Sequence, residues 1–132
     1  MLLDTSGILS LHHKAEPFHK LACSAFDAAS ARLTHSYILD EFVALANVRG
    51  VPRIDALTFS AYLLESPEME VVWVNESLHR EALALLLARL DKTYSLCDAV
   101  SFILMRRHRI TDALTTDHHF EQEGFRRLLT AH

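Results

Sequence analysis

Short apolar segments alternate with longer amphipathic segments along most of this chain. The apolar segments have the length and residue types of strands, and they lie at Leu2–Asp4, Arg32–His35, Glu70–Val74, Ala113–Thr115 and Arg127–Thr130. The amphipathic segments predict helices over Glu16–Ala31, Ser36–Arg49, Arg53–Glu65, Glu76–Leu90 and Leu96–His108. Strands that alternate with helices are typical of βαβ units. The pattern therefore predicts an α/β fold in which helices cover both faces of a mostly parallel sheet.

Residues with known capping preferences support several of these boundaries. Ser36 is suited to cap the helix that it begins, and Gly50 and Pro52 are suited to end it. Ser95 and Asp98 have the spacing of a capping box, in which each residue bonds the backbone N–H of the other.

Length and composition indicate one domain spanning residues 1–132. Half of the residues are hydrophobic and 23% are charged, which fits one compact core and argues against disorder. No apolar run reaches the ~20 residues that a membrane span needs, and no signal-like segment opens the chain. Cys23 and Cys97 are too few for a disulfide framework, so we expect reduced thiols in a cytoplasmic protein.

Four carboxylates stand at the edges of apolar segments. Asp4 and Asp117 follow predicted strands, whereas Glu41 and Asp98 lie near the amino ends of predicted helices. In parallel α/β sheets ligands bind beyond the carboxyl ends of the strands, and this topology places all four acids on that rim. Such a pocket suits hard divalent cations, which makes phosphate chemistry the first function to consider.

Each of these acids also has a structural explanation. Asp4 can form a turn or cap the next helix, Asp98 completes the capping box with Ser95, and Asp117 can cap the short turn after it. Glu41 is the hardest to explain in this way, because it shares a helix face with apolar side chains. The joint placement of the four acids favours a common site.

These acids belong to segments that resemble the successive motifs of the PIN-domain nucleases, in particular small prokaryotic toxins of the VapC type. The segments are Leu2–Ser6, Thr34–Phe42, Ser95–Ser101 and Leu114–Phe120. The resemblance covers nearly the whole chain and implies a three-layer α/β/α sandwich with a central mostly parallel sheet. It also implies a Mg²⁺- or Mn²⁺-dependent endoribonuclease with a cognate antitoxin. The implied metal ligands are Asp4, Glu41, Asp98 and Asp117, and the adjacent hydroxyl positions are Thr5, Ser95 and Thr116.

The residue types are consistent with this chemistry. Carboxylates suit Mg²⁺ and Mn²⁺, and the absence of a cysteine cluster argues against structural zinc. The net charge of −4 argues against a protein that coats RNA through bulk electrostatics, but a nuclease whose acids hold cations is not excluded. Adjacent histidines such as His118 and His119 do not chelate one ion well, and we interpret His118 as an exposed loop residue. The alternative function is a catalytically silent PIN-like module that binds RNA or protein.

Surplus apolar side chains predict partners for the chain. They lie in two of the predicted helices, at Phe18, Phe26, Leu57, Phe59, Tyr62 and Leu63. Exposed apolar surface generally marks an association site, so we expect a homodimer and a groove for an amphipathic antitoxin segment. The alternative is that all six side chains pack within the monomer. A leucine stripe at residues 83, 86, 87 and 90 is core or interface by the same reasoning.

Overall fold

The computed structural model describes residues 1–131 and contains one parallel sheet of five strands in the order β3-β2-β1-β4-β5. The strands are β1 (Leu2–Leu3), β2 (Leu33–His35), β3 (Glu70–Val72), β4 (Asp112–Leu114) and β5 (Arg126–Arg127). The helices are α1 (Thr5–His12), α2 (His19–Ala28), α3 (Ser36–Val48), α4 (Arg53–Glu65), α5 (Glu76–Leu87), α6 (Leu96–Arg107) and α7 (His119–Gln122).

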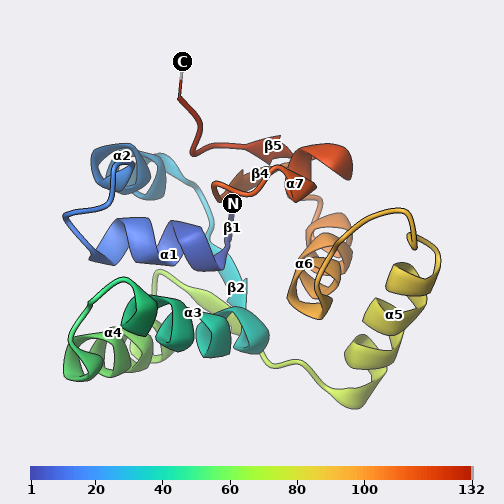
Figure 1. The fold of residues 1–132 in the computed structure, drawn as a ribbon, viewed down its shortest axis with the longest axis horizontal. Coiled ribbons are helices and arrows are strands. Elements are labelled where there is room, and N and C mark those ends of the chain that lie inside the picture. Colours follow the sequence, from blue (N-terminus) through green and yellow to red (C-terminus); the bar gives the residue numbers. More distant parts are fainter. Residues whose placement is uncertain (132) are drawn as a thin grey trace.

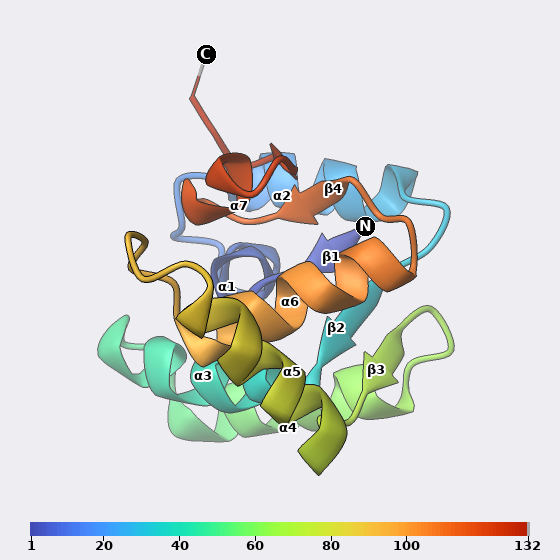
Figure 2. The same cartoon turned by 90° about the vertical axis from the view of Figure 1, so that its right-hand side faces the viewer.

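Helices cover both faces of the sheet. Helices α1 to α4 lie on one side of β1 and β2, and α5 and α6 lie on the other side, as Figures 1 and 2 show. The expected fold class, an α/β sandwich around a central parallel sheet, is therefore confirmed, and every strand pairing is parallel. In the part of the chain that is described, no helix combines the length and apolarity that a membrane span requires.

Strand β1 occupies the centre of the sheet although it has only two residues. Leu2 is in register with Leu33 on one side, and Leu3 is in register with Leu114 on the other. Both leucines of β1 are fully buried. Because hydrogen bonds and apolar packing reach it from both neighbours, this short strand is sufficient to fix the residue that follows it, Asp4.

Helix α1 follows β1 at once and was missing from the sequence prediction. Its first turn includes Gly7, and a Cβ atom at this position would lie 2.0 Å from the carbonyl oxygen of Leu114. Glycine therefore allows α1 to sit directly against the end of β4. A glycine close to a strand end suggests a turn when only the sequence is read, which explains why the helix was missed.

A buried histidine connects β2, α3 and α6. His35 caps α3 by accepting a hydrogen bond from the backbone N–H of Ile38 at 3.4 Å, and its Nε2 bonds the hydroxyl of Ser101 at 2.8 Å. Burial lowers the pKa of His35 to about 3. The ring is therefore neutral, and its Nδ1 can accept the capping bond from Ile38. The expectation that Ser36 caps α3 was wrong, because its hydroxyl accepts from the N–H of Val74 instead.

Candidate metal centre

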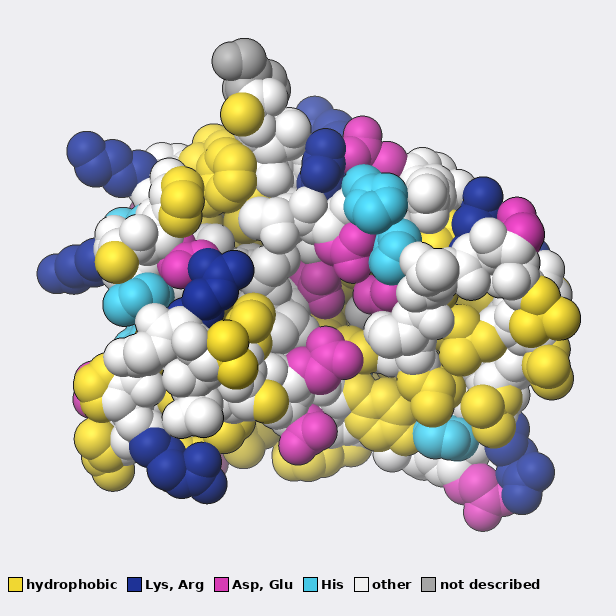
Figure 3. All heavy atoms as spheres, viewed as in Figure 1, with side chains coloured by type: hydrophobic (Ala, Val, Ile, Leu, Met, Phe, Trp, Pro, Cys, Tyr) yellow, Lys and Arg dark blue, Asp and Glu magenta, His cyan; other side chains and the backbone are white. Residues whose placement is uncertain are grey.

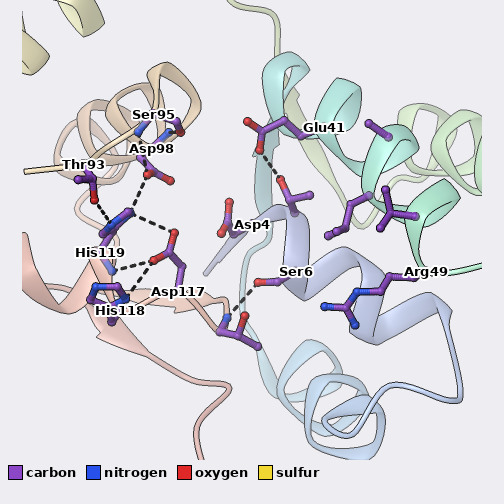
Figure 4. Close-up of a pocket in the computed structure, with 15 residues that line it drawn as sticks. Asp4, Ser6, Glu41, Arg49, Thr93, Ser95, Asp98, Asp117, His118 and His119 are labelled. Atoms are coloured by element: carbon purple, nitrogen blue, oxygen red, sulfur yellow. Dashed lines mark hydrogen bonds and ion pairs between the residues drawn. The ribbon is translucent and has the colours of Figure 1, made fainter.

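The seven residues selected from the sequence line one cavity at the carboxyl edge of the sheet. The cavity has a volume of about 800 Å³, and its lining includes Asp4, Thr5, Glu41, Ser95, Asp98, Thr116 and Asp117. Figure 3 shows acidic side chains in the hollow at the centre of this face, with histidine side chains beside them. Figure 4 shows the four acids facing a common space from four separate parts of the fold.

Asp4 is the most enclosed acid of the four. It follows β1, and its Oδ2 accepts a hydrogen bond of 2.7 Å from the hydroxyl of Thr115, just after β4. Burial raises the pKa of Asp4 to about 7, although the bond from Thr115 opposes this change. The nearby charges of Asp98 and Asp117 raise it further. Asp4 occupies the N-cap position of α1 without making a side-chain capping bond.

Asp98 combines the structural and the functional interpretation. It forms the expected capping box: its Oδ2 accepts from the N–H of Ser95 at 3.1 Å, and its own N–H donates to the hydroxyl of Ser95 at 3.0 Å. The same carboxylate lines the cavity, and burial raises its pKa. The cap therefore fixes the orientation of this acid at the wall of the cavity.

Glu41 and Asp117 are more accessible to solvent. Glu41 lies on the cavity side of α3, and its Oε2 accepts from the hydroxyl of Thr5 at 3.1 Å. Asp117 follows β4, and its Oδ1 accepts from the backbone N–H of His119 at 2.9 Å. The protein thus holds an oxygen of each of the four carboxylates with a neutral donor, which fixes the direction in which each acid points.

Three neighbours of the acids were not selected from the sequence. Thr115, rather than the adjacent Thr116, provides the hydroxyl that contacts Asp4, and it also accepts from the N–H of Asp117 at 3.0 Å. Ser6 lies 3.3 Å from the hydroxyl of Thr115 and accepts from the N–H of Thr116 at 3.0 Å. The strand register distinguishes Thr115 from Thr116: since Leu3 pairs with Leu114, the next residues of the two strands, Asp4 and Thr115, are neighbours.

His119 is the third residue that sequence reasoning missed. Its Nδ1 lies 3.1 Å from Oδ2 of Asp98 and 3.3 Å from Oδ2 of Asp117. The side chain of His119 is largely enclosed, whereas that of His118 is exposed, as expected. A single ring nitrogen therefore lies between two of the four acids.

The donor set fits a hard divalent cation. Carboxylate oxygens are the ligands that Mg²⁺ and Mn²⁺ prefer, and four of them face one cavity. The raised pKa values of Asp4 and Asp98 record the cost of burying acids next to one another, and a cation would remove that cost. Thr5, Ser95 and Thr115 would orient the ligands without contacting the ion.

Comparisons with known proteins show the family of the chain. The family model described as PIN domain matches residues 1–125. The crystal structure of VapC20 from Mycobacterium tuberculosis, a toxin that cleaves the sarcin–ricin loop, is similar with a TM-score of 0.85 and 26% sequence identity. The similarity covers 95% of this chain and 95% of that chain. Comparison with curated proteins gives no match. The chain therefore belongs to the PIN domain family and is of the VapC type.

Proposed function

We propose that this protein is a metal-dependent endoribonuclease and the toxin of a toxin–antitoxin pair. The observation that carries the proposal is the single cavity lined by Asp4, Glu41, Asp98 and Asp117 at the carboxyl edge of a parallel sheet. Membership of the PIN domain family and the likeness to a VapC toxin support it. In this proposal the four acids hold Mg²⁺ or Mn²⁺, and Thr5, Ser95 and Thr116 form the polar wall beside them.

The residues of the chain would prepare the site for hydrolysis of an RNA phosphodiester. Bound there, the cation would activate a water for attack on phosphorus and offset the charge that develops on the phosphate oxygens. Asp4 would be the central ligand, because it is the most deeply buried of the acids and Thr115 fixes one of its oxygens. Asp98 would be held by the capping box and Glu41 by Thr5, so neither acid must be ordered when the substrate arrives.

RNA cleavage by substituted proteins tests this function. We expect Asp4→Asn and Asp98→Asn to abolish Mg²⁺-dependent cleavage while circular dichroism shows a retained fold. Ser95→Ala removes the cap but leaves the acid, so it separates loss of helix capping from loss of a ligand. Asp40→Asn is the matched control, since Asp40 is an exposed neighbour of Glu41 outside the cavity. Cleavage at the wild-type rate by both Asp4→Asn and Asp98→Asn would refute the proposed ligand role.

The products and the substrate can be tested in the same assay. Attack by water activated by a metal leaves a 5′-phosphate and a 3′-hydroxyl, which end-labelling distinguishes from a cyclic phosphate. A structured ribosomal RNA loop is the first substrate to try, because the similar VapC20 cleaves the sarcin–ricin loop. The alternative function, a silent PIN-like binding module, requires RNA or protein binding with no cleavage under any divalent cation. Two free cysteines and an RNA substrate fit a cytoplasmic protein.

Exposed apolar side chains support partner binding on the expected helix α4 and on a second surface. Of the six side chains selected from the sequence, only Leu57 and Tyr62 are exposed; the other four are buried or packed against the core. Ile54 and Leu64 of α4 are exposed as well, and a second apolar surface lies on α5 and just after it, where Leu83, Leu87 and Leu90 are 43%, 71% and 80% exposed. Apolar side chains gather over α5 in Figure 3. We propose that these surfaces serve a homodimer and the cognate antitoxin.

A further inference from the structure

His119 brings an imidazole nitrogen into the carboxylate cluster. It is the first residue of α7, directly after the turn that contains Asp117. Its Nδ1 lies about equally far from one oxygen of Asp98 and one oxygen of Asp117, at 3.1 and 3.3 Å. Figure 4 shows the ring between the two acids, at the edge of the cavity. Separations of this size are those of neighbouring ligand atoms around one small cation, whose bonds to oxygen or nitrogen are about 2.0–2.2 Å long.

The ring is held in place from its other side. Nε2 of His119 lies 3.1 Å from the hydroxyl of Thr93, in the loop that precedes α6. The ring also packs edge-on against Tyr94, with 5.2 Å between the ring centroids and an interplanar angle of 69°. Histidines that bind metals usually donate their second N–H to a fixed acceptor, which sets the tautomer and the ring orientation. The hydroxyl of Thr93 can be that acceptor, which leaves the lone pair of Nδ1 directed toward the acids.

A hydroxyl partner also suits the ring when no cation is bound. The oxygens of Asp98 and Asp117 can only accept when they are ionised, so Nδ1 must then carry the proton. The hydroxyl of Thr93 can turn and donate to Nε2 in that state, because a hydroxyl is both donor and acceptor. A shift of one proton from Nδ1 to Nε2 therefore changes His119 from a hydrogen-bond donor into a ligand without a change of net charge.

We propose that Nδ1 of His119 is a ligand of a cation held between Asp98 and Asp117, and that this nitrogen makes the centre prefer Mn²⁺ to Mg²⁺. The inference rests on the proposed function, because it assumes that the four acids hold a cation. Mg²⁺ demands oxygen ligands and gives up its waters reluctantly, whereas imidazole suits the transition ions better. A purely carboxylate site would lack this source of discrimination.

The proposal can be tested by pulsed electron paramagnetic resonance of bound Mn²⁺, which detects a directly coordinated imidazole nitrogen. We expect this nitrogen signal in the wild-type protein and in the control His108→Asn, whose exposed ring lies outside the cavity. We expect no such signal in His119→Asn. Asparagine at this position keeps an N–H donor near Nδ1 but provides no nitrogen ligand, so it separates ligation from positioning of the two acids.

Binding constants give a second measurement that does not depend on cleavage. Calorimetric titration should show that His119→Asn weakens Mn²⁺ binding by about tenfold or more, while Mg²⁺ binding changes by much less. Thr93→Val should weaken Mn²⁺ binding in the same direction by about tenfold, because it removes the partner of Nε2.

Two results would overturn the inference: wild-type protein that binds Mn²⁺ without a coordinated nitrogen signal, or an unchanged ratio of Mn²⁺ to Mg²⁺ affinity in His119→Asn. Either result would leave the four-carboxylate centre intact. If Asp4→Asn binds Mn²⁺ as tightly as the wild type, the proposed centre itself fails, and the inference fails with it.

Discussion

The buried carboxyl group of Asp4 should make the metal-free protein less stable as the pH rises. Burial raises the pKa of Asp4 from 3.8 to about 7. A group whose pKa is higher in the folded state stabilises the fold fully only below its unfolded pKa, and that contribution is lost as the pH rises through the folded value. The difference between the two values corresponds to about 4 kcal/mol of the free energy of unfolding, lost between about pH 4 and pH 7.

Asp4→Asn removes this loss because the amide does not ionise. Its oxygen can still accept the hydrogen bond from Thr115, so the packing is nearly conserved. We expect the free energy of unfolding of Asp4→Asn to exceed that of the wild type at pH 8 by up to about 4 kcal/mol. The two proteins should converge below about pH 4, where both side chains are neutral.

Urea unfolding followed by far-UV circular dichroism, with EDTA present, measures this difference at each pH. Asp40→Asn is the control; its exposed side chain should change stability by no more than about 0.5 kcal/mol. Adding Mg²⁺ or Mn²⁺ should reduce the difference in free energy of unfolding between Asp4→Asn and the wild type. The reduction should be about 2.7 kcal/mol at a cation concentration 100 times the Kd, because the cation binds and stabilises only the folded wild type. The reasoning would be refuted if Asp4→Asn exceeded the wild type in free energy of unfolding by the same amount at pH 4 and pH 8, or did not exceed it at either pH.

Three further substitutions or measurements test other parts of the structure. Gly7→Ala should lower the free energy of unfolding in urea by more than about 3 kcal/mol, because its Cβ would clash with the backbone oxygen of Leu114. Gly50→Ala is the comparison: its Cβ has free space, so it should cost only about 1–2 kcal/mol, the strain of a positive φ. Thr115→Val should lower the unfolding free energy by about 1–3 kcal/mol and cation affinity by about tenfold, and unchanged calorimetric affinity would contradict its orienting role. Light scattering at micromolar concentration should give about twice the monomer mass of 15.0 kDa; a constant monomer mass would exclude the homodimer.

The sequence predicted the arrangement of the acids better than the details around them. Asp4 and Asp117 follow strands, and parallel strands end at the same edge of a sheet, so their convergence follows from topology. Short-range patterns were sufficient for α4, whose observed bounds equal the predicted ones. They failed for α1, because Gly7 is there to permit close packing against a strand that is distant in the sequence.

The partners of the acids depend on side-chain positions that periodicity does not encode. Whether Thr115 or Thr116 contacts Asp4 is decided by the register between two strands more than a hundred residues apart. His119 shares the cluster only because the turn after Asp117 directs its ring back toward Asp98. His35 rather than Ser36 caps α3, because the hydroxyl of Ser36 accepts a hydrogen bond from the backbone N–H of Val74 instead. These contacts are determined by tertiary structure and not by local sequence patterns.

The distribution of positive charge gives an independent reason to regard the cluster as a cation site. Arginines pair with acids elsewhere in the fold, as in Arg49 with Glu16 and Arg107 with Glu81. Within residues 1–131, no lysine or arginine forms an ion pair with any of the four cavity acids, although Arg49 lines the same cavity. An acid kept only for stability would gain from such a pair, because buried charges are otherwise costly. The protein instead surrounds these carboxylates with hydroxyls, backbone N–H groups and the imidazoles of His118 and His119. Their negative charge is thereby left for a cation that the chain itself does not supply.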